Sequence, residues 1–138
     1  KHFISAFGEH VIAKEVEQAL QDATKGTQIA VNEFTVAPQT NPENGLPYHE
    51  WFIEFEKEPK EMADFITKVD ASMQQQNSYY YDLIVGNILE PLKVTKIKKD
   101  GFRDYMKSIG KLGGQNKIPR LSNDRKIADQ LTEQKVRG

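Results

Sequence analysis

The segment YHEWFIEFE, residues 48–56, alternates between two kinds of side chain. Trp51, Ile53 and Phe55 fall on one side of an extended chain, whereas glutamates fall on the other. The apolar side also carries His49, and the glutamates are Glu50, Glu54 and Glu56. Because successive side chains of a strand point to opposite faces, the segment predicts a strand that is buried on its aromatic face and solvated on its glutamate face.

A long amphipathic helix is predicted directly after this strand. Pro59 suits the first turn of a helix, where its missing N–H is not needed. Apolar residues then recur at the spacing of one helix face, and we expect the helix to run to residue 75 or 76. These apolar residues are Met62, Phe65, Ile66, Val69 and Met73.

Weaker patterns on both sides complete the order of elements. Helices are predicted over residues 12–24 and 102–109 and after Asn123 or Asp124, and strands over residues 2–7, 28–36 and 92–98. Within residues 28–36 the apolar side chains change parity between Val31 and Phe34, which indicates either a bulge or a strand covered on both faces. Residues 37–47 are expected to form a long loop, whereas residues 77–87, with three consecutive tyrosines, fit either a further helical turn or an ordered loop.

The order of these elements predicts an α+β fold. We expect a mixed, largely antiparallel sheet of about four strands flanked by helices, in a ferredoxin-like strand and helix order with a C-terminal helical extension. The 138 residues fit a single domain, since a chain of this length buries one core and not two.

The composition restricts the partners of the chain. Nineteen Lys and Arg residues nearly balance twenty Asp and Glu residues, so the net charge gives no reason to expect nucleic acid or an anionic membrane. No apolar run reaches the length of a membrane span, and the absence of cysteine excludes disulfides and thiolate metal sites. We expect a cytoplasmic protein whose side chains hold no metal ion. Because the sequence starts at Lys1 without a methionine, we also expect a segment of a longer protein.

A glycine-rich stretch near the C-terminus has the composition of a binding loop. It is GGQNKIPRL, residues 113–121, followed by SNDR, residues 122–125. The glycines free the backbone and Pro119 restricts it, while Lys117 and Arg120 place cations on either side of that proline. This composition predicts a shaped loop that meets an anionic group, against the commoner alternative of a solvated connection. The order of residues does not match a nucleotide-binding P-loop.

This stretch, together with residues 123–125, resembles the C-terminal signature of the auxin-responsive promoter family, the acyl acid amido synthetases. Shorter matches precede it at the family's order and spacing, and they are Pro91-Leu92, Gly101-Phe102 and Gly110. Residues 3–5, 8–9, 15–17 and 19–20 are similar to the start of the family's C-terminal domain and to the segment after the hinge in adenylate-forming enzymes. The resemblance spans about residues 3–131.

The resemblance implies one part of a two-step ligase. Enzymes of this family activate a carboxylic acid with ATP and Mg²⁺ to an acyl adenylate, which the amine of an amino acid then attacks to give an amide. Residues 1–138 would form a single domain, the mobile C-terminal lid, whose partners are the N-terminal adenylation domain of the same polypeptide, the acyl acid and the amino acid. Neither ATP nor Mg²⁺ is expected to bind to this domain alone, and the isolated domain is expected to be inactive.

The resemblance also assigns roles to individual residues. Lys117 matches the lysine of the family signature and is expected to be catalytic and to bind phosphate, because an ammonium group stabilises charge that develops on phosphate. Gln115 is a further expected polar contact at the phosphates. Arg120 either supports the phosphates or holds the loop by pairing with a carboxylate. Gly8 and Glu9 correspond to the hinge-side loop of the family.

One alternative from a different functional class stays open. The lysines of residues 93–99 and the tyrosines of residues 79–81 fit a stand-alone ferredoxin-like module that binds a partner or nucleic acid. The balanced net charge makes nucleic acid the less expected partner. For the tyrosines, core packing is the expected role, because no basic residue follows them where the family would place one.

Overall fold

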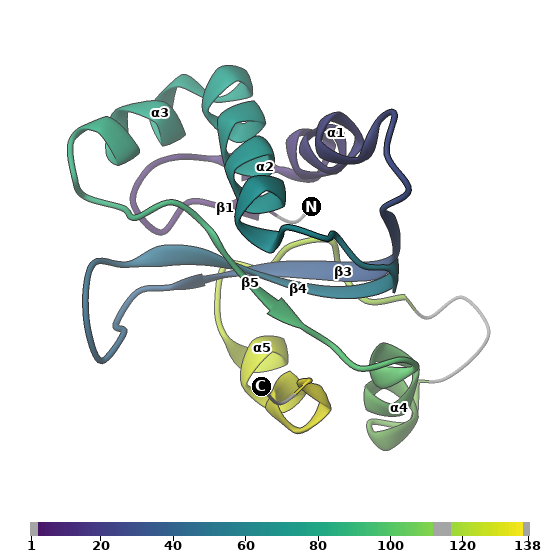
Figure 1. Ribbon diagram of the computed structural model, residues 1–138. Helices are drawn as coiled ribbons and strands as arrows, with labels where there is room; N and C mark the ends of the chain where they lie inside the picture. Colours follow the sequence, from purple (N-terminus) through teal and green to yellow (C-terminus); the bar gives the residue numbers. More distant parts are fainter. Residues whose placement is uncertain (1–2, 112–116, 137–138) are drawn as a thin grey trace.

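A sheet lies between two groups of helices in this protein (Figure 1). The computed structural model describes residues 3–111 and 117–136. One face of the sheet is covered by α1 (Ala13–Thr24) and α2 (Met62–Gln76), after which α3 (Ser78–Val85) follows, and the other face by α4 (Gly101–Ser108), α5 (Lys126–Gln130) and the 3-10 helix η1 (Leu131–Gln134). The predicted long helix is α2, whose Phe65, Val69 and Met73 are buried as expected.

The main sheet is mixed. Its strands in spatial order are β3 (Ala30–Gln39), β4 (Tyr48–Lys57) and β5 (Lys93–Lys96). β3 and β4 are antiparallel, whereas β4 and β5 are parallel. The strand predicted at residues 2–7 is limited to β1 (Phe3–Ile4), which pairs with β2 (Val11–Ile12) in a separate small sheet. The predicted α+β class, with a mixed sheet flanked by helices, is confirmed.

Both faces of β4 are buried, which corrects the predicted solvated glutamate face. Ile53 packs in the core with α1 and α2, whereas Phe52 packs in a second core with α4, α5 and η1. Glu50 and Glu54 lie on this second side, and only 7% and 3% of their surfaces are exposed. Glu56, close to the end of the strand, is exposed as predicted. The prediction is wrong for the first two glutamates because the helices after β5 return to cover their face of the sheet.

The parity change in β3 reflects a bulge. The register of β3 against β4 shifts between Ala30 and Val31 and again between Val31 and Glu33. Further along the strand, Val36 and Ala37 pack into the cores on opposite faces of the sheet. The two alternatives that the sequence left open, a bulge and a strand covered on both faces, therefore occur together.

The buried carboxylate of Glu54 fixes the start of α4. It accepts hydrogen bonds from the backbone N–H groups of Asp100 at 3.1 Å and Phe102 at 3.3 Å, and from the side-chain amide of Asn32 at 2.8 Å. The first N–H groups of a helix have no partner within the helix, so a carboxylate at this end stabilises it. The N-cap residue itself, Asp100, has a φ of 63° and makes no side-chain cap. Glu54 therefore caps α4 from the neighbouring strand.

We expect Glu54→Ala to lower the free energy of unfolding by about 2–3 kcal/mol, since it leaves buried backbone donors without an acceptor. Urea denaturation at neutral pH measures this loss. The matched control is Glu56→Ala on the same strand, where an exposed carboxylate is removed and the change should stay below about 0.5 kcal/mol. Equal losses in the two variants would contradict the capping role.

Asn77 separates α2 from α3 and decides the structure of residues 77–87. Its side-chain oxygen accepts a hydrogen bond from the backbone N–H of Tyr80 at 2.9 Å, which is the geometry of a helix N-cap. The segment is thus a second helix and not a continuation of α2. Tyr80 is 1% exposed, whereas Tyr79 and Tyr81 are 64% and 47% exposed, so the expected core packing holds for Tyr80 alone.

Candidate functional site

Residues 120–122, at the end of the glycine-rich stretch, run beside β3. The backbone N–H of Val36 donates to the Arg120 carbonyl at 3.0 Å, and the N–H of Ser122 donates to the Val36 carbonyl at 2.9 Å. These bonds form a single parallel bridge between Val36 and Leu121. The loop therefore ends on the edge of the main sheet, next to β3.

Side chains hold the same segment from both faces of the sheet. Leu121 is buried in the core with α1 and α2, and Ile118 is buried in the core with α4 and α5. The hydroxyl of Thr35 donates to the carbonyl of Pro119 at 2.7 Å. Lys117 precedes these anchors and is exposed. The fold thus presents a cation at the point where the loop meets the sheet.

Lys117 lines a groove of about 380 Å³ between this segment and α4. The other cations of the groove are Arg103, Lys111 and Arg120, and its carboxylates are Glu33, Glu54 and Asp100. Two of these carboxylates already have partners, because Glu54 caps α4 and Glu33 pairs with Arg120. With four cations against three carboxylates in its lining, the groove carries a formal excess of one positive charge, which suits an anionic ligand.

Arg120 is held by two carboxylates. Its Nη1 pairs with Glu33 of β3, and its Nε lies 3.4 Å from Oε2 of Glu17 on α1. The guanidinium carbon lies 4.8 Å from the centre of the Phe34 ring. Of the two roles that the sequence leaves open, pairing with a carboxylate is the one that this arrangement displays. A phosphate contact by Arg120 stays a prediction.

Gln115 lies outside the described residues, together with the two glycines of the loop and Asn116. Its expected contact at the phosphates therefore stays a prediction. The described part of the site consists of Lys117, the groove beside it and the segment that leads back to the sheet.

Gly8 and Glu9, which are expected to form the hinge-side loop, lie apart from this groove. Gly8 is exposed and has a φ of 88°, a left-handed conformation that favours glycine. Glu9 is fully buried, with Oε2 2.6 Å from Nε2 of His49 and Oε1 accepting the N–H of Phe7 at 2.8 Å. Burial by itself raises the pKa of Glu9, but the hydrogen bond and the charge of His49, together with backbone N–H donors, outweigh it, and the pKa lies below its usual value. The Glu9 side chain thus anchors the N-terminal segment in the core, and the structure does not bring it together with Lys117.

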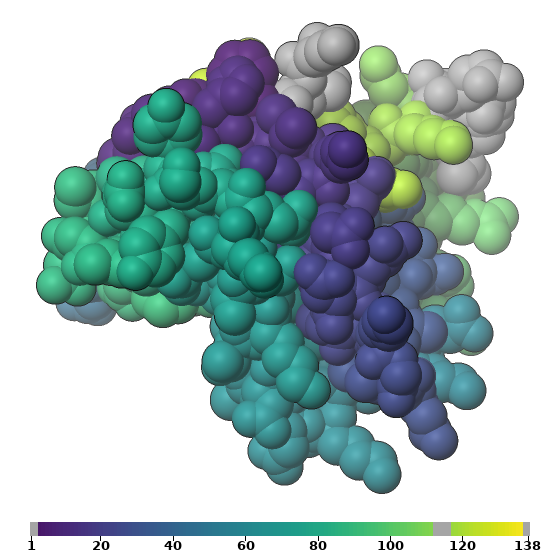
Figure 2. Space-filling model, turned by 90° about the horizontal axis from the view of Figure 1, so that it is seen from above, coloured from purple at the N-terminus to yellow at the C-terminus, as the bar shows by residue number. Residues whose placement is uncertain are grey.

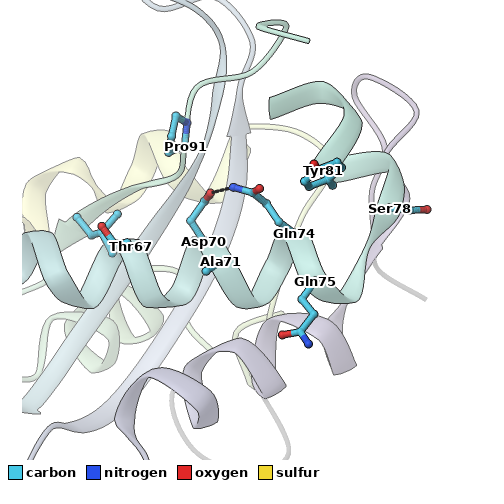
Figure 3. A pocket seen from close by; sticks show the side chains of 9 residues that line it. Thr67, Asp70, Ala71, Gln74, Gln75, Ser78, Tyr81 and Pro91 are labelled. Atoms are coloured by element: carbon cyan, nitrogen blue, oxygen red, sulfur yellow. Dashed lines mark hydrogen bonds between the residues drawn. The ribbon is translucent and has the colours of Figure 1, made fainter. Parts of the chain in front are cut away.

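A larger hollow, of about 660 Å³, lies between α2, α3 and Pro91 (Figure 3). Figure 2 shows α2 and α3, in teal, separated from the segment after the glycine-rich loop, in yellow-green, by the N-terminal residues and α1. In Figure 3 the Gln74 amide points at Asp70, to which it donates at 2.7 Å. The Asp70 carboxylate also accepts hydrogen bonds from the Tyr80 hydroxyl and from the Leu92 N–H. Asp70 is the charged residue of this mostly apolar hollow, and its carboxylate is already hydrogen-bonded within the fold. The smaller groove at Lys117 is therefore the candidate site.

The basic edge at residues 93–99 is largely neutralised. Its ion pairs join Lys93 to Glu90 at 3.9 Å, Lys96 to Glu58 at 3.2 Å and Lys98 to Asp104 at 3.9 Å. These pairs reduce the positive charge on which nucleic-acid binding would depend.

No three His, Asp or Glu side chains within residues 3–111 and 117–136 gather as metal ligands. Of the helices that the structure describes, none has the length and apolar character required to cross a membrane.

The model of a known family, described as the GH3 family C-terminal domain, matches residues 14–126. The chain belongs to the GH3 family. The matched range contains Lys117 and Arg120 and begins after Gly8 and Glu9. This match, together with the two solved structures described next, confirms the resemblance to the C-terminal domain of the acyl acid amido synthetases. No curated protein matches the chain.

Two solved structures share the fold of this GH3 domain. One is a GH3.15 acyl acid amido synthetase, with a TM-score of 0.78 at 16% sequence identity over 99% of this chain and 27% of that chain. The other is the AtGH3.15 acyl acid amido synthetase in complex with 2,4-DB, with a TM-score of 0.74 at 14% identity over 99% of this chain and 26% of that chain. The chain thus spans about a quarter of the length of these synthetases.

Three residues that contact the segment carrying Lys117 are not predictable from the sequence. Glu17 lies in α1, and Glu33 and Thr35 lie in β3, all far from the loop along the chain. The charge of Arg120 signals that a carboxylate could pair with it, but choosing one among twenty acidic residues requires the topology. The support of the site is therefore visible only in three dimensions.

Proposed function

We propose that this GH3 domain is the mobile C-terminal lid of an acyl acid amido synthetase, the activity for which the solved proteins of the same fold are named. Such a ligase activates a carboxylic acid with ATP and Mg²⁺ as an acyl adenylate and conjugates the acyl group to an amino acid. The observation that carries the proposal is the position of Lys117, an exposed cation on a segment tied to the sheet, beside a groove with excess positive charge.

The first step of such a ligase requires a cation at the phosphates. When a carboxylate oxygen attacks the α-phosphorus of ATP, the bond to the β-phosphate oxygen breaks and pyrophosphate leaves with the electron pair. A positioned ammonium group such as that of Lys117 stabilises the negative charge that the phosphates carry in this step. The amine of the amino acid then attacks the acyl carbon and AMP leaves. A lid that carries Lys117 can move away between the two steps.

The pockets for the nucleotide and the acyl acid belong, in this proposal, to a larger N-terminal domain of the same polypeptide. The described residues hold no carboxylate cluster that would bind Mg²⁺ by itself. The solved synthetases are about four times as long as this chain, which leaves room for such a domain. We therefore expect the isolated chain to be inactive, and we place the complete enzyme in the cytoplasm, where ATP and amino acids are available.

The test is ATP–pyrophosphate exchange by a polypeptide that carries both domains. Labelled pyrophosphate should enter ATP only when a suitable carboxylic acid from a panel is added. Adding amino acids should then release AMP and form an amide, detected by mass spectrometry. The absence of acid-dependent exchange and of amide across the panel would refute the proposed function, as would full activity of the 138-residue chain alone.

A further inference from the structure

The position of Lys117 depends on a short stretch of backbone. The segment that carries Lys117, residues 117–122, meets β3 through the bridge between Val36 and Leu121. Two backbone hydrogen bonds and the Thr35 hydroxyl hold this bridge. One bridge is a weak anchor compared with a full strand, because each hydrogen bond contributes only about 1 kcal/mol net. Side-chain contacts must therefore contribute to fixing the segment that carries Lys117.

Arg120 supplies such contacts to two different elements. Its Nη1 pairs with Glu33 in β3 and its Nε faces Glu17 in α1 at 3.4 Å, so two edges of the guanidinium are in use. The Glu33 carboxylate is itself fixed, since its Oε1 accepts the backbone N–H of Phe34 at 3.0 Å. The guanidinium also lies against the Phe34 ring at 4.8 Å. Arg120 is thus oriented from three sides, although 40% of its side chain is exposed.

The charges at this point argue against a phosphate contact. Two carboxylates face Arg120, and a phosphate brought to the same guanidinium would meet their negative charge at short range. Lys117 differs, because among the described residues no carboxylate lies within ion-pair distance of it. The two cations of the loop are therefore in different electrostatic environments.

We infer that Arg120, Glu17 and Glu33 form a clamp whose role is to position Lys117. The inference rests on the proposed function of Lys117 and adds positioning residues to it. In this clamp Arg120 acts on catalysis through the backbone of residues 118–121 and does not contact the phosphates. Glu33 matters as much as Arg120, because it fixes the guanidinium to the sheet.

The decisive variants are Glu33→Gln and Arg120→Lys in the polypeptide with both domains. Glu33→Gln frees Arg120 from one carboxylate, and Arg120→Lys keeps the charge but loses the fork that reaches two carboxylates. For a clamp, both variants should lower the kcat of acid-dependent exchange about ten- to a hundred-fold, with little change in the KM for ATP. For a phosphate ligand, Glu33→Gln would leave exchange unchanged or faster. Unchanged or faster exchange in Glu33→Gln therefore overturns the clamp.

An activity-independent measurement accompanies these rates. Hydrogen exchange followed by mass spectrometry should show faster exchange of the amides of Val36 and Ser122 in Glu33→Gln, because these amides form the bridge. The matched control is Glu43→Gln, which removes an exposed carboxylate from the loop before β4 and should change neither measurement. If the parent protein shows no acid-dependent exchange, the proposed function fails, and amide exchange alone then decides the clamp. Unchanged amide exchange in Glu33→Gln overturns it in either case.

Discussion

Replacing Lys117 by alanine should slow acid-dependent ATP–pyrophosphate exchange about a hundred- to a thousand-fold in the polypeptide that carries both domains. The reason is that the ammonium group acts where negative charge develops during adenylation, and no neighbouring cation of the groove occupies its position on the segment. The loss should be in kcat more than in the KM for ATP, because the interaction is stronger in the transition state than in the bound nucleotide. Initial rates at saturating ATP and acid measure it.

Two further variants make the Lys117 result specific. Lys68→Ala removes an exposed lysine from α2, on the far side of the sheet, and should leave exchange unchanged. Lys111→Ala removes a cation from the same groove and separates a general effect of charge from a role of Lys117 itself. Because Lys117 is exposed, its replacement should change the free energy of unfolding by less than about 0.5 kcal/mol. Exchange by Lys117→Ala within about twofold of the parent would remove the catalytic assignment.

The sequence predicts the elements of this fold because their patterns are local. Helix α2 repeats apolar residues at the helical period from Met62 to Met73, and strand β4 alternates from His49 to Phe55; both elements occur where they are expected. Glu54 marks the limit of this reasoning. A glutamate that alternates with aromatic residues is typical of a solvated strand face, yet its carboxylate is buried against the start of α4, which lies 46 residues further along the chain. Burial of a carboxylate requires distant donors that no local pattern specifies.

The candidate site, like the fold, is only partly predictable from the sequence. Lys117 and Arg120 are recognisable because the glycines and Pro119 next to them mark a shaped loop. The partner of Arg120 is not recognisable, since Glu33 lies 87 residues earlier and its direction depends on the bulge at the start of β3. A shift of one position in a strand moves a side chain to the other face. The chemistry of the loop is thus readable from the sequence, whereas the contacts that orient it depend on the register of β3.

Removing the Glu9 carboxylate should cause a larger loss of stability than any other substitution considered for this domain. Glu9→Ala leaves His49, of which 1% is exposed, buried without its partner and also removes the acceptor for the Phe7 N–H. Breaking a buried pair by deleting one partner costs about 3–5 kcal/mol. We therefore expect the free energy of unfolding at neutral pH to fall by about this amount in Glu9→Ala, as measured by urea denaturation.

The pH dependence of this loss follows from the direction of the Glu9 pKa. Although burial opposes ionisation, His49 and the backbone hold the pKa of Glu9 in the folded protein below its usual value, so the unfolded chain binds the proton more readily. The stability that Glu9 contributes is thus fully present above the usual pKa of a glutamate and is lost as the pH falls through the lower folded-state value. The difference between the parent protein and Glu9→Ala should accordingly be largest near neutral pH and shrink on acidification.

A double substitution distinguishes the contribution of the Glu9–His49 pair from that of packing at the same two positions. Replacing both partners by apolar residues, as in Glu9→Met with His49→Phe, removes the buried polar group left without its partner and should recover part of the stability lost in Glu9→Ala. Glu43→Ala, an exposed carboxylate in the loop before β4, is the control for the loss of one negative charge and should change the free energy of unfolding by less than about 0.5 kcal/mol. A loss below about 1 kcal/mol in Glu9→Ala, or a loss that stays constant on acidification, would show that this buried pair does not anchor the N-terminal segment.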